Sequence, residues 1–302
     1  MNKVVKFIIM ALVFLITSCN KSKTIDGISK YENISSVSDF ASELWIKGNT
    51  FKVSFSDDYR TFYFFRKVAP DIEKYVPYKS KYINGKWEEP QIMAFFDKKN
   101  SYTYQLKVPN SDKLIFISNK KTKKDTTQNP NYNFWQTTLE KDKHSKPEEI
   151  EYKNLIYNYN SQPCITNNGT IFFSSDLPDW SETLSYKMSL INNEYSEPEL
   201  FGPVNNWRRN EDWKVFEFCV SPKEDYMIIC IQDISVSDLS TDLYISYFDN
   251  DYWTHPEKLN SEINSSETEN FPSLTNDGKY LIFTRAFSEF KIIPTKFFES
   301  KQ

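Results

Sequence analysis

The stretch from Pro272 to Phe283, PSLTNDGKYLIF, consists of a strand end, a tight turn and a second strand. Its turn is Asn276-Asp277-Gly278. An Asn or Asp followed by Gly tolerates the positive φ angles that a short β-hairpin requires. The apolar run YLIF that follows the turn is typical of a buried strand. The stretch therefore predicts a β-hairpin, and the rest of the chain can be compared with it.

Four earlier stretches repeat this pattern of strand, polar turn and apolar strand. They are SFSDDYRTFYFF from Ser54, KVPNSDKLIFIS from Lys107, CITNNGTIFFSS from Cys164 and CVSPKEDYMIIC from Cys219. Equivalent turn positions are separated by 53, 57, 55 and 54 residues, counted over Ser56, Pro109, Thr166, Ser221 and Thr275. Such self-similarity at a fixed period indicates a repeat architecture.

A second landmark follows each of the first four hairpins. It is an aromatic residue or histidine followed three positions later by proline, at Trp87–Pro90, His144–Pro147, Tyr195–Pro198 and Trp253–Pro256. Proline suits an outer edge strand, because it cannot donate a hydrogen bond to a neighbouring strand. Each unit then has four strands, which describes the blade of a β-propeller. We expect an all-β propeller of five blades, with a sixth, degenerate blade as the alternative.

The chain length indicates how the ring closes. After Thr275 only 302 − 275 = 27 residues remain, about half of one unit. We expect residues around Phe40 to Ile46 to supply the outermost strand of the last blade, so that both ends of the domain share one blade. The propeller domain is predicted to cover residues 39–302.

The repeats resemble the TolB-type, WD40-like propeller repeat, whose pattern is roughly P-S-F-S-P-D-G-K-x-L-Y-F, then D-I-Y, then W-x-x-P. The matching stretches are Pro272 to Phe283, Asp242-Leu243-Tyr244 and Trp253 to Pro256, and the resemblance covers roughly Phe40 to Phe298. The second and fourth hairpins lack the turn glycine. The resemblance implies a propeller in the cell envelope with a tendency towards protein–protein contacts.

The N-terminus has the features of an export signal. Lys3 and Lys6 precede the apolar run Phe7–Ile16, which is too short to span a bilayer and has the length of a signal-peptide core. The run ends in Ile16-Thr17-Ser18-Cys19, which is similar to the lipobox of bacterial lipoproteins. The resemblance implies a signal peptide over residues 1–18 and acyl chains on Cys19, which anchor the protein in a membrane of the envelope. The polar residues 19–38 are predicted to be a flexible tether.

Composition and motifs narrow the function classes. The net charge of −4 comes from mixed acidic and basic residues, which disfavours a nucleic-acid partner. The sequence contains no hydrolase elbow, zinc motif or phosphate-binding loop, and we expect no cofactor and no metal. The only histidines, His144 and His255, belong to the outer-strand landmarks. Carboxylates at the propeller axis would leave no local signature, so a glycosidase-like activity stays open.

The stretch GPVNNWRRNEDWK from Gly202 holds the candidate contact residues Trp207, Arg208, Arg209 and Trp213. Exposed Trp and Arg are typical anchors of protein interfaces. A loop packed against its blade, with both tryptophans buried, is the alternative. The main hypothesis is a non-enzymatic binding or scaffold module for an envelope protein partner, and the alternative is a glycan-binding or glycan-active propeller.

Overall fold

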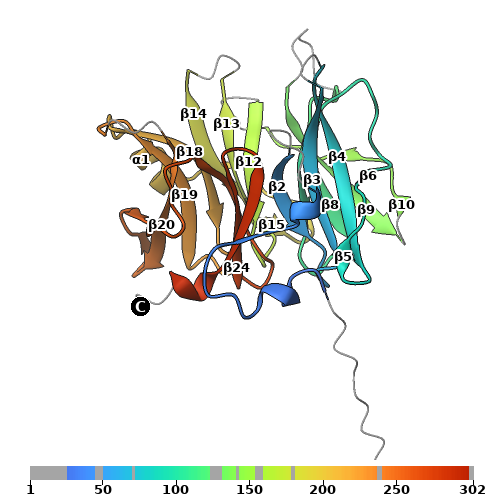
Figure 1. Ribbon diagram of the computed structural model, residues 1–302. Helices are drawn as coiled ribbons and strands as arrows, with labels where there is room; N and C mark the ends of the chain where they lie inside the picture. Colours follow the sequence, from blue (N-terminus) through green and yellow to red (C-terminus); the bar gives the residue numbers. More distant parts are fainter. Residues whose placement is uncertain are drawn as a thin grey trace, which may run out of the picture.

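The computed structural model describes residues 26–44, 50–69, 72–122, 131–140, 143–153, 159–177, 181–236 and 240–298. Five antiparallel sheets stand around a common axis (Figure 1). The innermost strands β2 (Thr50–Phe55), β7 (Tyr102–Lys107), β12 (Tyr159–Ile165), β18 (Trp213–Val220) and β23 (Glu269–Leu274) contact one another in this order, and β23 contacts β2. The predicted five-bladed propeller is therefore confirmed.

Each blade adds further strands outward from its inner strand, and all of its strand pairs are antiparallel. The first blade continues with β3 (Thr61–Ala69), β4 (Ile72–Ile83), β5 (Lys86–Trp87) and β6 (Gln91–Ile92). The second continues with β8 (Lys113–Ser118), β9 (Asn133–Glu140), β10 (Lys143–His144) and β11 (Glu148–Glu149). The third continues with β13 (Ile171–Asp176), β14 (Thr183–Met188) and β17 (Glu199–Leu200), beside the small hairpin of β15 (Leu190–Ile191) and β16 (Glu194–Tyr195).

The fourth blade continues with β19 (Tyr226–Asp233), β20 (Asp242–Asp249), β21 (Tyr252–Trp253) and β22 (Glu257–Lys258). The fifth continues with β24 (Tyr280–Arg285), β25 (Glu289–Pro294) and β1 (Ser38–Asp39). The described helices are short: α1 (Gly202–Trp207) and the 3-10 turns η1 (Ser29–Tyr31), η2 (Ser42–Leu44) and η3 (Thr295–Phe297). Within the described ranges, no helix has the length and apolar character needed to cross a bilayer.

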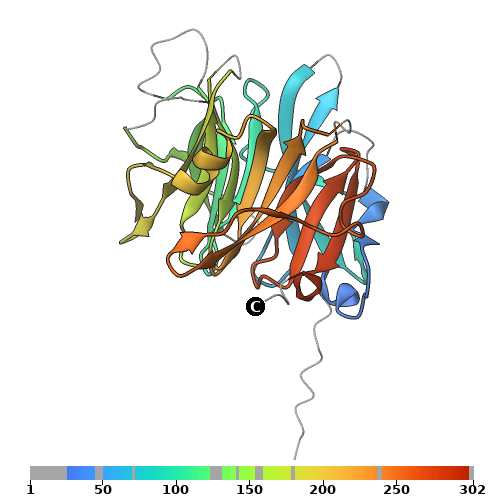
Figure 2. The same cartoon turned by 90° about the vertical axis from the view of Figure 1, so that its left-hand side faces the viewer.

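The ring closes through both ends of the domain, as predicted, but the closing strand lies earlier in the chain. Strand β1 pairs with β25 through Ser38 opposite Ile292, and Figure 2 shows the N-terminal segment beside the last blade. Phe40, predicted to begin this strand, follows it: its N–H donates to the carbonyl of Phe290 at 2.8 Å, and its ring is fully buried. Phe40 contacts Phe55 and Phe62 of the first blade at ring-centre distances of 5.8 Å each, so it joins the last blade to the first.

The described part of the predicted tether is packed against the propeller. Ile28 and Tyr31 belong to the same buried cluster as Phe40. The N–H of Gly27 donates to the carbonyl of Tyr59, and Gly27 lies so close to Trp87 that a Cβ would meet its ring at 2.0 Å. The expectation of a flexible segment up to residue 38 is therefore wrong from about residue 27 onward, because apolar side chains bury there.

The hairpin turns show how the repeat tolerates the loss of its glycine. Gly169 and Gly278 have φ angles of 86° and 73°, as a tight turn requires. The first and fourth blades place Tyr59 and Glu224 there instead, with φ angles of 54° and 62°. In all four turns the N–H of this residue donates to the carbonyl of the Ser or Thr three positions earlier. The turn geometry is thus preserved at the cost of some backbone strain.

Candidate functional site at the propeller axis

A break in pairing register occurs at the same height in all five inner strands. Each strand has a bulge, between Phe51 and Ser54, Thr103 and Leu106, Ser161 and Cys164, Val215 and Phe218, and Asn270 and Ser273. Lys52, Tyr104, Gln162 and Phe271 lie within four of these bulges with positive φ angles of 35°, 52°, 53° and 53°. Bulges re-aim side chains and are frequent next to functional sites. The axis is therefore the first place to look for a site.

An aromatic pocket of about 140 Å³ lies where the inner strands begin. Its lining comes from four blades: Phe51, Phe65, Tyr75, Thr103, Tyr104, Tyr132, Tyr159, Asn160, Ser161 and Phe271. The rings pack on one another, with centre distances of 5.0 Å for Phe51 to Phe271, 5.0 Å for Phe65 to Tyr104 and 4.3 Å for Tyr132 to Tyr159. We call this cavity the aromatic pocket.

Several buried polar atoms in the side chains of the bulges lack a hydrogen-bond partner among the described residues. Lys52, Gln105 and Glu217 are 4%, 3% and 4% exposed. In the part of the chain that the structure describes, the Lys52 Nζ, both Gln105 amide atoms, one oxygen of Glu217 and the Gln162 Oε1 have no hydrogen-bond partner. Buried polar groups are normally satisfied, because leaving one unpaired costs roughly 1–3 kcal/mol. We call the side chains of Lys52, Gln105, Gln162 and Glu217 the axial polar group. Their burial lowers the free energy of unfolding.

Glu217 is the carboxylate of this group. Burial raises its pKa to about 7, although the Lys52 ammonium and the backbone N–H of Phe271 both favour the charged form. A carboxyl with a pKa near neutrality changes its charge at ordinary pH. Carboxyl groups with strongly shifted pKa values are frequent in functional sites.

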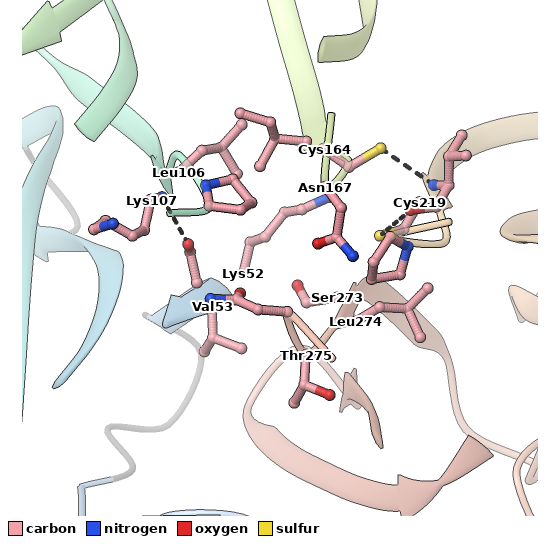
Figure 3. A pocket seen from close by; sticks show the side chains of 16 residues that line it. Lys52, Val53, Leu106, Lys107, Cys164, Asn167, Cys219, Ser273, Leu274 and Thr275 are labelled. Carbon is pink, nitrogen blue, oxygen red and sulfur yellow. Dashed lines mark hydrogen bonds between the residues drawn. The ribbon is translucent and has the colours of Figure 1, made fainter. Parts of the chain in front are cut away.

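A second axial cavity, of about 40 Å³, lies at the hairpin-turn end of the ring. Figure 3 shows Lys52 extending across it towards Cys164. The Sγ of Cys164 accepts a hydrogen bond from the N–H of Val220 at 3.2 Å, and Cys164, Cys219 and Cys230 are free thiols. Burial raises the pKa of Cys164, whereas the thiol of Cys164 and the Lys52 ammonium lower that of Cys219. Cys164 and Cys219 line this cavity, where they pack as small side chains.

The residues predicted to form a contact surface lie together between the third and fourth blades, but they point in different directions. Trp207 and Trp213 are partly buried and pack on the cluster that contains Phe201 and Phe218. Arg209 and Trp213 line an open groove. Their role as a contact surface stays a prediction.

Arg208 also lines this groove, but its guanidinium is directed inward. It donates to Ser174 Oγ at 3.1 Å, and burial lowers its pKa to about 10. Burial raises the pKa of the nearby Asp176, which accepts hydrogen bonds from Ser161 and Thr183. Arg208 therefore serves to hold the third blade together through buried polar contacts.

The chemistry available at the axis is limited within the described residues. None of the residues that the structure describes in the lining of either axial cavity is an Asp or Glu. No cluster of three or more metal-ligating side chains occurs in the ranges that the structure describes. His144 packs edge-on against Phe95 at 5.2 Å, and His255 packs on Trp213 at 4.9 Å, so both contribute to outer-strand packing. Cys19 lies outside the described residues.

Comparisons with known proteins establish the fold alone. The chain is similar to a protein of unknown function from Dyadobacter fermentans, with 11% identity and a TM-score of 0.51, over 88% of this chain and 85% of that one. It is also similar to the microbial sialidase Hz136, with 12% identity and a TM-score of 0.46, over 81% of this chain. A puromycin-hydrolysing peptidase of Mycobacterium tuberculosis has 10% identity and a TM-score of 0.41, over 78% of this chain.

The chain spans 54% of the length of that sialidase and 34% of that peptidase. No protein-family model matches the chain. A search of curated proteins gives no match either.

Proposed function

We propose that this chain is a lipid-anchored protein of the bacterial envelope, and that its propeller is a non-enzymatic binding module that takes a group of its partner into the aromatic pocket. The observation that carries the proposal is the pocket itself. Aromatic side chains from three blades and Phe271 of a fourth surround a cavity at the axis, and none of its described lining residues is a carboxylate. A few placed polar groups among apolar walls are the usual composition of a ligand site.

The absence of a lining carboxylate favours binding over glycoside hydrolysis. That reaction uses two carboxyl groups, about 5 to 10 Å apart, on either side of the scissile bond. Glu217 is buried and interacts with Lys52, and Asp176 accepts hydrogen bonds from Ser161 and Thr183. A binding module needs neither group to be free.

The volume of the pocket indicates how much of a partner it holds. Pockets for drug-sized ligands measure roughly 300–1,000 Å³. The aromatic pocket, at about 140 Å³, accepts a single ring or side chain. We therefore infer recognition of one protruding group of a larger partner, a protein in the first instance. A sugar ring of a glycan is the second candidate, because aromatic faces also stack on sugars.

Under this proposal, the anchored segment and the aromatic pocket lie at opposite ends of the ring. Between Cys19 and Asp26 the chain spans at most ~25 Å when fully extended. The N–H of Gly27 donates a hydrogen bond to the carbonyl of Tyr59, which lies in the first hairpin turn. The segment that follows the proposed anchor therefore joins the propeller at the end of the ring that carries the hairpin turns. The aromatic pocket lies at the other end, where the inner strands begin. An anchored propeller would therefore present the pocket away from the bilayer.

Two sets of variants test the proposal. Cys19→Ala should move the protein from the membrane to the soluble fraction; retention in the membrane would refute the anchor. Tyr75→Leu, in the pocket, should reduce co-purification of crosslinked envelope partners, whereas Tyr252→Leu, at an exposed tyrosine of β21, should not. Equal recovery with both tyrosine variants, or loss only with an Arg209→Ala variant, would place binding elsewhere.

A further inference from the structure

We infer that the aromatic pocket selects a cationic nitrogen that carries N–H donors, an ammonium or guanidinium group. This inference rests on the proposed binding function and names the chemistry of the group that enters. A lysine or arginine side chain of a partner protein and a free amine, such as a polyamine or an amino sugar, share this chemistry.

The walls provide the first argument. Seven of the ten lining residues are Phe or Tyr. The faces of such rings carry partial negative charge, and a cation within about 6 Å of a ring centre is attracted more strongly when it leaves water. Phe51 lies 5.0 Å from Phe271 and 6.0 Å from Tyr75 between ring centres, so several rings surround one small volume.

The charges around the pocket provide the second argument. Burial raises the pKa of Tyr104, and the carboxylates of Glu217 and Asp176 raise it further, so both acidic groups act electrostatically on this lining residue. Among the described residues, neither a Lys nor an Arg lines the pocket. Lys52 lines the cavity at the other end of the axis and attracts Glu217, while Arg208 attracts Asp176 and donates to Ser174. The described lining thus offers ring faces and hydrogen-bond acceptors without a fixed positive charge, which favours a positive guest over a negative one.

A buried acceptor provides the third argument. Asn160 lines the pocket, is 1% exposed, and its Oδ1 has no partner among the described residues. Its amide nitrogen donates to the hydroxyl of Tyr152 at 2.6 Å, which fixes the orientation of the side chain. A guest that donates a hydrogen bond would satisfy this oxygen. A primary ammonium or guanidinium meets this requirement as well as the electrostatic one, whereas a quaternary ammonium has no N–H.

The test compares guests of matched shape. Nα-acetyl-lysine methylamide and its norleucine counterpart differ mainly by the charged amine, and NMR titration of the full propeller measures both affinities. The lysine compound should bind at least about tenfold more tightly, as expected for a desolvated cation–π site. Spermidine and glucosamine, titrated in parallel, separate the two sources: tighter binding of either would identify a free amine as the guest.

Variants identify the pocket as the binding site. Tyr159→Leu should abolish the preference for the amine, Tyr159→Phe should keep most of it, and Asn160→Leu should weaken lysine binding several-fold. Tyr252→Leu, at an exposed outer tyrosine, is the matched control and should change nothing. Unchanged thermal unfolding shows that each variant is folded, and Asn160→Asp offers a second variant at that position, which should bind the amine at least as well as the wild type.

The outcomes separate this inference from the proposed function. Equal binding of the lysine and norleucine compounds would overturn the cation selectivity while leaving the pocket as a binding site. Undetectable binding of every amine would also overturn it, and the partner recovery measured with Tyr75→Leu would then decide the proposed function independently.

Discussion

Replacing Glu217 by glutamine should change how the stability of the protein depends on pH. Burial holds the pKa of Glu217 at about 7, against an ordinary value of 4.5. The folded state thus favours the protonated carboxyl more than the unfolded chain does. Stability from this group is fully present below pH 4.5, declines as the pH rises through 7, and is lost above it. Glutamine resembles the protonated carboxyl and cannot lose a proton.

The magnitude follows from the two pKa values. The difference between about 7 and 4.5 corresponds to ~3 kcal/mol, at about 1.36 kcal/mol per unit. Wild type and Glu217→Gln should be similarly stable at pH 4.5, while the variant should be more stable by ~3 kcal/mol at pH 8.5. The attraction of Lys52 is already contained in this difference, because it acts on the ionised form.

Urea unfolding at a series of pH values measures this effect, with the free energy of unfolding compared between the two proteins at each pH. Thermal unfolding is a second measurement. At pH 8.5, ~3 kcal/mol should raise the melting temperature of the Glu217→Gln variant by roughly 6–12 °C in a chain of this size. Glu194→Gln, at an exposed carboxylate of β16, is the control and should follow the wild type throughout. A stability difference that is the same at pH 4.5 and pH 8.5 would show that Glu217 titrates normally in the folded protein.

The other predictions concern the ring, one turn and the thiols. Phe40→Ala should lower the free energy of unfolding by about 3–5 kcal/mol, because it empties the fully buried contact between the last and first blades; a loss below about 1 kcal/mol would contradict this role. Gly169→Ala should cost more than Gly85→Ala, since both have positive φ angles but only the former brings a Cβ within 2.6 Å of Leu190; equal losses in urea unfolding would refute the crowding argument. The three buried cysteines should react with a thiol reagent only after unfolding; rapid labelling of the native protein would show that the axis is open to it.

The repeat predicted the architecture because each blade has the same local chemistry. Turn signals such as Asn276-Asp277-Gly278 and the recurring proline landmarks depend on neighbours in sequence, and they identified the strands and the ring. The exact closing strand did not follow from them. Ser38 and Asp39 carry no apolar pattern, and they pair with β25 because Phe40 and Tyr31 on either side are buried between blades. That is a tertiary effect, invisible in a short window of sequence.

The axial site escaped prediction for a related reason. The bulge residues Lys52, Tyr104, Gln162, Glu217 and Phe271 occupy corresponding places in five repeats but share no residue type, so no motif marks them. The signal was in the variation between repeats, where a charged or amide side chain interrupts an otherwise apolar strand. Such residues are costly to bury. The proposed binding function would give a reason to keep them, because the ring brings these five positions to one axis.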